Sequence, residues 1–184
     1  MPDLFEQPDD ATTLTLAEIR DLMPAQISSR DELNEAEQEN ILRRQDWTLR
    51  RQSNLLSEKF IRALHKQMLG DVCRWAGKIR TSERNLGIGY WEIPGAVRQL
   101  LDDAKTWIEF RTYPSDEIAV QFHHRLVQIH PFSNGNGRRS RLMADLLIME
   151  LGGERFSWGS AQLQAAGEVR RRYRQPISTI AARC

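Results

Sequence analysis

The residues best suited to chemistry lie in one short stretch, residues 130–142. A histidine ends one apolar helical pattern, a Gly-Asn-Gly turn follows, and a strongly apolar helical pattern begins beyond it. Glycines at a helix start leave backbone N–H groups able to face an anion, and the helix dipole adds positive potential there. The imidazole of His130 can accept a proton near neutral pH. The stretch therefore places a base next to an anion cradle.

Two arginines, Arg138 and Arg141, follow the turn three residues apart. At that spacing they project roughly 60° apart around one helix, so that both can reach one polyphosphate. Positive charge at a helix N-terminus is unfavourable unless an anion compensates it, so a merely solvated basic turn explains these residues poorly. For His130 taken alone, a helix-end histidine that caps carbonyl groups is the alternative. Together the residues indicate a site for nucleotide chemistry.

The stretch resembles the signature of the Fic family, H-x-F-x-D/E-G-N-G-R-x-x-R. Seven of its eight specified positions match, namely His130, Phe132, Gly135, Asn136, Gly137, Arg138 and Arg141. The exception is Asn134, where the family normally has an acid. An asparagine there is frequent in the bacterial group called mobile mystery protein B, which this chain resembles. Segments 75–80, 85–94 and 122–130 are also similar to the Fic core.

A Fic enzyme joins a side-chain hydroxyl of a target protein to a nucleotide phosphate, and its commonest reaction transfers AMP from ATP to Ser, Thr or Tyr. The resemblance therefore implies a protein adenylyltransferase in which His130 takes the hydroxyl proton. It implies nucleotide and phosphate binding by Gly135, Asn136, Gly137, Arg138 and Arg141. Because arginine forks match phosphate geometry, and phosphoryl-type transfer depends mostly on positioning and electrostatics, these groups are nearly sufficient for the reaction.

The family acid at position 134 holds Mg²⁺ against the nucleotide phosphates, so the resemblance implies ATP as substrate and Mg²⁺ as cofactor. Asn134 can still ligate Mg²⁺ through its carbonyl oxygen, but it contributes no negative charge. Three outcomes follow from that difference. They are a weaker metal affinity, which we favour, another phosphate orientation with different transfer chemistry, and nucleotide binding without turnover.

A second feature is segment 87–93, which mixes glycine with β-favouring residues and predicts a short hairpin. By the resemblance this hairpin corresponds to the flap that aligns a target chain by strand addition. The target-binding residues would then be Ile88, Gly89, Tyr90 and Trp91. A plain packed hairpin is an equal alternative.

Many Fic proteins are inhibited by a helix that carries S/T-x-x-x-E-G/N, whose glutamate pairs with the second arginine of the signature. Glu32 follows Ser28 at the right spacing, and Glu39 stands before an asparagine, so each matches the pattern in part. We hypothesise that Glu32 or Glu39 approaches Arg141. A capped surface helix with solvated acids is the alternative.

The resemblance leaves other activities open. The same site could use another nucleotide or transfer another group, and a non-catalytic nucleotide-binding or interaction module would bind ATP without a covalent product. The expected partner is a target protein with a modifiable hydroxyl, and an antitoxin-like inhibitor or a homodimer could restrain the site. A nucleic-acid partner is not expected, because the net charge is only +1 and no basic stripe is visible.

Length and composition fit one globular domain with an appended element: 184 residues, 28% charged and 40% hydrophobic. Cys73 and Cys184 form neither a disulfide framework nor a zinc pattern. No apolar run is long enough to span a membrane and the acidic N-terminus lacks the design of a signal peptide, so we expect a cytoplasmic protein. We divide the chain into an N-terminal helical extension, residues 1–54, as a candidate inhibitory element, and a Fic-type core, residues 55–184.

The elements that must position the site are predicted to be almost all helical. Capping boxes at Thr15 and Ser29 predict a short helix before Pro24 and a long charged helix to about residue 52. Further helices are expected over residues 55–69, 95–111, 114–130 and 135–151, with a basic helical tail from residue 160. The fold is therefore predicted to be mainly α, a Fic-type helical bundle with one small β-hairpin flap.

Apolar stripes predict how these helices dock. One stripe of the long charged helix should face the core: Leu33, Ala36, Asn40 and Trp47. The helix that ends at His130 should bury Ile118, Phe122, Leu126 and Ile129. The helix over 135–151 is apolar nearly all round, so we expect it at the centre of the bundle.

Overall fold

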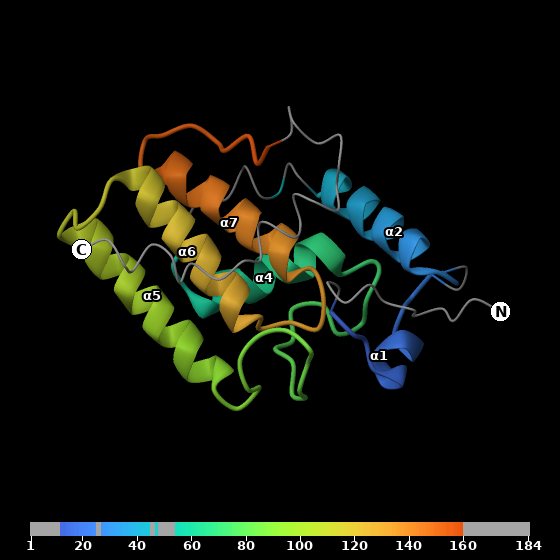
Figure 1. Ribbon diagram of the computed structural model, residues 1–184. Helices are drawn as coiled ribbons and strands as arrows, with labels where there is room; N and C mark the ends of the chain where they lie inside the picture. The colour runs from blue at the N-terminus through green and yellow to red at the C-terminus, as the bar shows by residue number, and fades with distance from the viewer. Residues whose placement is uncertain (1–11, 25–26, 45–46, 48–53, 160–184) are drawn as a thin grey trace.

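The structure is a computed structural model, which describes residues 12–24, 27–44, 47 and 54–159 (Figure 1). Its helices are α1 (Leu16–Arg20), α2 (Arg30–Arg43), α4 (Glu58–Leu69), α5 (Ile93–Glu109), α6 (Ser115–Ile129) and α7 (Asn136–Glu150). The predicted mainly α fold is confirmed for this part of the chain, and each of these helices lies where the sequence predicts one. The predicted tail helix lies outside the described residues.

Helix α7 forms the centre of the bundle, as its apolar sequence predicts. Its fully or nearly fully buried apolar side chains are Met143, Ala144, Leu146, Leu147 and Ile148. Helix α6 packs along α7, and α5 packs along α6 (Figure 1). Helix α4 contacts α2, α5 and α7. The loop between α6 and α7 is thus anchored at both ends in the core.

Helix α6 delivers the histidine of the candidate site. Its predicted stripe is buried, with at most 6% exposure for Ile118, Phe122, Leu126 and Ile129. The helix ends at His130, which adopts the left-handed conformation with φ 54° and ψ 57°. Only a few per cent of non-glycine residues have positive φ, because the Cβ atom crowds the backbone there. His130 is therefore held in a conformation that its surroundings must impose.

The two N-terminal helices begin at the predicted caps. Thr15 and Ser29 each accept a hydrogen bond from the backbone N–H three residues on, at Glu18 and Glu32. Both glutamates return a carboxylate to the backbone N–H of their cap residue. Each capping box satisfies two backbone donors that the first helical turn would otherwise leave unbonded.

Helix α2 docks on α4 through the predicted stripe. Leu33 and Asn40 are fully buried, and the Asn40 amide donates to the carbonyl oxygen of Met68 over 2.8 Å near the end of α4. The helix ends at Arg43, whereas the sequence predicts a continuation to about residue 52, most of which lies outside the described residues. Trp47, which is described, stacks on Phe60 with ring centroids 6.4 Å apart.

The predicted hairpin in residues 87–93 is wrong, because the described backbone there forms turns that lead directly into α5. The Arg80 guanidinium donates to the carbonyl oxygens of Ser82 (2.9 Å) and Ile88, so acceptors that a strand pair would use are bonded to a side chain. Pro94, in the first turn of α5, has no N–H to offer a neighbouring strand.

Little β pairing accompanies the helices. Outside helices, the part of the chain that is described contains one isolated antiparallel bridge, between Leu22 and Cys73. The Met23 N–H donates to the carbonyl oxygen of Val72 over 2.9 Å beside that bridge, which fixes the segment after α1 to the segment after α4. None of the described helices is long and apolar enough to cross a membrane.

Candidate active site

The backbone of His130 is held by Arg80. Nε of the Arg80 side chain donates to the carbonyl oxygen of His130 over 2.8 Å. The backbone N–H of Arg80 donates to the carbonyl oxygen of Pro131 over 3.0 Å. Arg80 is 3% exposed and also binds the 82–88 segment, so one side chain joins the loop after α6 to the turns before α5. Sequence reasoning placed Arg80 in a Fic-like segment but gave it no role.

The ring of His130 is oriented by a second contact. Nδ1 lies 3.3 Å from the carbonyl oxygen of Val127, which can only accept, so Nδ1 carries the proton in the neutral ring. Nε2 then carries the lone pair, as a base requires. Nε2 faces the hydroxyl of Thr12 at 2.8 Å. The predicted base is thus held with its acceptor nitrogen toward a hydroxyl group.

Gly87 packs flat against His130. Its φ is +97°, and a Cβ atom placed there would overlap the Cβ atom of His130 and approach the guanidinium of Arg80 to 3.0 Å. Only glycine fits both the backbone conformation and this close approach. The segment predicted to be a hairpin therefore supports the base, and its glycine belongs to the site.

We call residues 130–137 the site loop. Asn136 fastens it: the Phe132 N–H donates to Oδ1 of Asn136 over 3.0 Å, and Nδ2 of Asn136 donates to the Phe132 carbonyl oxygen over 2.7 Å. Asn136 is 2% exposed. We predicted that the Asn136 side chain binds phosphate, but here both ends of its amide are bonded to the backbone of the loop. In this arrangement Asn136 is a positioning residue.

Gly135 and Gly137 differ in what surrounds them. Gly135 has a φ of +70°, and a Cβ atom there would lie 2.8 Å from Cδ1 of Leu69, so its glycine serves the protein's own packing. A Cβ atom on Gly137 would meet nothing within 4 Å. Gly137 therefore leaves open space beside the first turn of α7, where N–H groups and the helix dipole favour an anion.

The buried ring of His65 packs against the site loop. Its ring stacks on Phe132 with centroids 3.9 Å apart, and Nε2 lies 3.0 Å from the carbonyl oxygen of Asn134. Nδ1 accepts from the Gly77 N–H over 2.9 Å, so Nε2 is the donor. Complete burial, together with the charge of Arg139, lowers the pKa of His65 to about 3. His65 thus holds the loop as a neutral ring.

Helix α2 brings a carboxylate to the site loop. Glu37 is fully buried, accepts from Nδ2 of Asn134 over 2.7 Å and pairs with the guanidinium of Arg138. Arg30 donates to Oδ1 of Asn134 over 3.1 Å. The predicted metal residue and the first predicted phosphate arginine are therefore both engaged by side chains of α2. Arg141 lies half-buried, three residues further along α7.

The acids that the sequence suggested occupy other places. Glu32 is exposed and forms the capping box with Ser29, and hydrogen bonds from Ser28 lower its pKa. Glu39 is exposed and lies 3.9 Å from Arg43. The motif search therefore missed Glu37, but the sequence held a different indication: Glu37 stands four residues after Leu33, so it is an acid placed on the predicted buried stripe of α2.

A metal site is harder to build here than the resemblance implies. The described residues contain no group of three His, Cys, Asp or Glu side chains that could hold a metal ion. The amide oxygen of Asn134 faces the Arg30 guanidinium, and a cation cannot share that oxygen with a second positive group at hydrogen-bonding distance without strong repulsion. In this arrangement the residues at Asn134 do not fit Mg²⁺.

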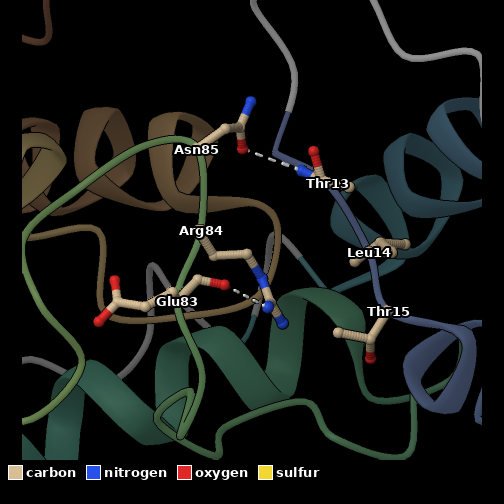
Figure 2. A pocket seen from close by; sticks show the side chains of 6 residues that line it. All are labelled: Thr13, Leu14, Thr15, Glu83, Arg84 and Asn85. Atoms are coloured by element: carbon tan, nitrogen blue, oxygen red, sulfur yellow. Dashed lines mark hydrogen bonds between the residues drawn. The ribbon is translucent and has the colours of Figure 1, made fainter.

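The segment before α1 lies over the site. Thr12 contacts His130, and the Thr13 N–H donates to Oδ1 of Asn85 over 3.2 Å (Figure 2). Figure 2 also shows Leu14 and Thr15 of this segment facing Glu83 and Arg84 across a pocket. We call the described residues 12–24 and 27–44 the N-terminal cover. The sequence predicted this region as a candidate inhibitory element and did not place Thr12 at the base.

The predicted target-binding residues lie at the edge of the site. Tyr90 and Trp91 are 39% and 67% exposed, and their rings meet edge to face with centroids 5.3 Å apart. Ile88 is half-buried, with its carbonyl oxygen bonded to Arg80. Gly89 lies against the side chains of Trp91 and Glu92. The turn therefore presents an aromatic pair to solvent beside the segment that supports His130.

Comparison with known proteins places the site in a family context. The Fic/DOC family model matches residues 55–148, just over half of the chain. The chain is 30% identical over 153 residues to the protein adenylyltransferase Fic of Aedes aegypti, an alignment that covers 78% of this chain and 30% of that protein. It is 37% identical over 93 residues to the protein adenylyltransferase fic-1 of Caenorhabditis briggsae, covering 48% and 18%. The chain thus spans less than a third of the length of these curated relatives.

Solved structures share the fold. BepC of Bartonella tribocorum, whose structure has bound AMPPNP, superposes with a TM-score of 0.63 at 16% identity, over 86% of this chain and 96% of that one. Residues 134–508 of Fic-1 from Caenorhabditis elegans superpose with a TM-score of 0.58 at 23% identity, over 88% and 51%. At these identities the likeness establishes the Fic fold.

Proposed function

Because the chain belongs to the Fic/DOC family, we propose that it is a protein adenylyltransferase, which transfers AMP from ATP to a Ser, Thr or Tyr hydroxyl of a target protein. The observation that carries the proposal is the orientation of His130. Its Nε2 lone pair faces a hydroxyl group at 2.8 Å, while Val127, Arg80 and Gly87 hold the residue in place. Homologues of the chain at about 30% identity are protein adenylyltransferases.

In the proposed reaction His130 accepts the proton of the target hydroxyl as its oxygen attacks the α-phosphorus of ATP. The new oxygen–phosphorus bond replaces the bond to the bridging oxygen, and pyrophosphate leaves. The first turn of α7, with the open space at Gly137, is the proposed place for the phosphates, and Arg138 and Arg141 would neutralise their charge. Asn134 takes no part in the proposed step, since its amide oxygen accepts a hydrogen bond from Arg30.

Glu37 is the proposed restraint on this reaction. It occupies Arg138 with a carboxylate, which competes for the same guanidinium as a phosphate group. Glu37 also accepts a hydrogen bond from the side-chain amide of Asn134, the residue whose backbone carbonyl oxygen is bonded to His65. ATP would therefore have to displace a buried acid before Arg138 could bind it. This assigns the inhibitory role that we expected of α2 to Glu37.

The proposed target docks at the exposed turn that carries Tyr90 and Trp91. Its aromatic pair offers contact area beside the base, which suits capture of a segment from another protein. Restraint by an antitoxin-like partner or a second copy of the chain stays a proposal, as does membership of the mobile mystery protein B group, for which Asn134 is the supporting residue.

The test is transfer of label from α-labelled ATP to proteins of a cell lysate. We expect labelled target bands with the wild-type chain and none with His130→Ala, and a mass increase of one AMP on the target. His124→Ala is the matched control, because it removes a half-buried histidine of the same helix that is not placed at the loop. Label with a different mass would indicate another donor or group. Saturable ATP binding without any covalent product would contradict the proposal and favour an interaction module.

A further inference from the structure

Thr12 stands where the proposed reaction needs an acceptor hydroxyl. Its Oγ1 lies 2.8 Å from Nε2 of His130, and the residue is 7% exposed. Since Nδ1 of His130 donates to Val127, Nε2 is the acceptor and the Thr12 hydroxyl is the donor. A base and a hydroxyl within about 2.6–3.2 Å of each other have the geometry for proton transfer. The contact therefore pairs the base with a nucleophile from its own chain.

The neighbours of Thr12 hold it in this place. The Thr13 N–H donates to Oδ1 of Asn85, which lies in the segment two residues before Gly87 (Figure 2). Leu14 is 5% exposed and packs in the hydrophobic core. The side chains at positions 12 and 14 thus point inward and the one at 13 is exposed, as in an extended segment laid on a surface.

A second anchor lies further along the chain. The carboxylate of Glu18 pairs with Arg84 and accepts from Ser133 of the site loop. The side chain of Arg84 is only 3% exposed and that of Glu18 is 15% exposed, and a charge-assisted contact this poorly solvated is a strong one. Thr12 is therefore presented to His130 by a segment that is fixed to both sides of the site.

We propose that Thr12 is an AMP acceptor within its own chain. The inference rests on the proposed adenylyltransferase function and names a substrate for it. Oγ1 of Thr12 attacks the α-phosphorus of ATP while its proton passes to Nε2 of His130. The Oγ1–P bond forms, the bond from the α-phosphorus to the α–β bridging oxygen breaks, and pyrophosphate leaves with that electron pair. The product is a phosphodiester on Thr12, and no other reactant is consumed.

This assignment has a consequence for target proteins. A target hydroxyl must reach the same Nε2 atom that Thr12 occupies, so the unmodified segment competes with the target. AMP on a residue that is 7% exposed cannot be accommodated without moving the segment outward. Self-modification would therefore both use and then vacate the acceptor position.

The first experiment incubates the full chain with α-labelled ATP and maps the modified residue by peptide mass spectrometry. We expect one AMP on Thr12 in the wild-type chain and in Thr12→Ser, which keeps the hydroxyl. Thr12→Val, which keeps the shape, should fall to the background of His130→Ala. Thr13→Val is the matched control, because it removes the adjacent hydroxyl while its backbone N–H can still bond to Asn85. Comparable melting temperatures would verify that the variants fold.

A second measurement distinguishes modification within one chain from modification between chains. The rate constant should not change over about a hundredfold range of protein concentration, because the acceptor is already held at the base. Chains that carry His130→Ala keep Thr12 but lack the base, and they should stay unlabelled when they are mixed with the wild-type chain. Efficient labelling of those chains, label mapped to another residue, or full labelling of Thr12→Val would overturn the inference.

The outcomes also separate this inference from the function on which it rests. If lysate proteins are labelled in a His130-dependent way but Thr12 is never modified, self-modification is overturned and the transferase function stands. If neither the lysate nor the chain acquires label, both are overturned. The mapping on the wild-type chain needs no variant, so a failure of Thr12→Val to fold would not protect the inference.

Discussion

The site loop and the N-terminal cover meet at the same atoms but are built in different ways. The loop joins two core helices, and its backbone is bonded to the buried side chains of Asn136, Arg80 and His65. The cover has few buried apolar residues: α1 has none, and the buried residues of α2 are Leu33, Glu37 and Asn40. Its contacts with the loop are polar and charged.

Because of that difference, the loop and the cover are suited to different roles in the site. Core packing holds the loop in one arrangement, because a dense interior does not deform continuously. The cover's polar contacts with the site can instead be exchanged for contacts with the charged groups of a nucleotide. The loop is thus suited to hold the base rigidly, and the cover is suited to give way to a nucleotide or a target.

The sharpest way to break the loop is through Gly87. Gly87→Ala would press a Cβ atom onto His130 and strain a backbone with φ +97°. We expect the transfer rate to fall by roughly a hundredfold, because displacing a catalytic group by about 1 Å costs that much. Gly95→Ala is the control, since a Cβ atom there meets nothing within 4 Å. Equal rates for the two variants would show that Gly87 does not position the base.

Acidic pH should destabilise the folded chain through His65, which packs against the loop. Its pKa is about 3 in the folded chain against 6.5 for an ordinary histidine, so below about pH 6.5 the unfolded chain binds a proton that the folded chain does not. Stability is therefore full above pH 6.5 and is lost as pH falls, by roughly 2 kcal/mol at pH 5. Burial lowers the pKa of His123 to about 4 and acts in the same direction.

The measurement is the free energy of unfolding in urea at pH 7 and pH 5. His65→Gln removes the titrating ring, so we expect it to be less stable at pH 7 but to lose less stability between the two pH values. A wild-type chain whose stability does not change over this window would contradict the neutral, buried assignment of His65.

Glu37 is the place to break the cover while leaving the loop intact. Glu37→Gln keeps the shape but removes the charge that holds Arg138. If the cover restrains the site, we expect transfer to rise about tenfold, within the range typical of coupling energies between sites. Glu39→Gln is the control on the same helix, because Glu39 is exposed and lies beside Arg43. An unchanged or lower rate in Glu37→Gln alone would give Glu37 a purely structural role.

Gly137→Ala has the smallest expected effect and tests whether the open space beside the first turn of α7 is used by phosphates. The protein leaves open space there, so folding should be unchanged or more stable by about 0.4–1 kcal/mol. If phosphates use that space, ATP binding measured by calorimetry should weaken by about tenfold or less. Gly135→Ala should do the reverse and lower stability, because its φ is +70° and Leu69 lies 2.8 Å away. Unchanged ATP affinity in Gly137→Ala would place the phosphates elsewhere.

The helices were predictable because their signals are local. The capping boxes at Thr15 and Ser29 and the stripe on α6 depend on residues three or four apart, and the structure contains them all. The signature residues from His130 to Arg141 were likewise readable, because they stand close together in the sequence, in one loop and the first two turns of one helix.

The hairpin and the inhibitory acid were not predictable from local pattern. The β-favouring residues of segment 87–93 lose their strand pairing to Arg80, whose influence depends on where the chain folds. Glu32 and Glu39 match a motif in part, yet Glu37 reaches Arg138, because the buried stripe of α2 decides which acid faces inward. In both places a tertiary contact overrides the local preference.

By itself, the sequence determined the mainly α class, the helix that carries the base and the composition of the loop, since periodicity, caps and a dense motif all act over a few residues. Only the tertiary structure decided which side chains meet that loop. Thr12 reaches His130 across 118 positions of the chain, and Glu37 reaches Arg138 across 101. Contacts at such separations depend on how whole helices dock, which no window of residues encodes.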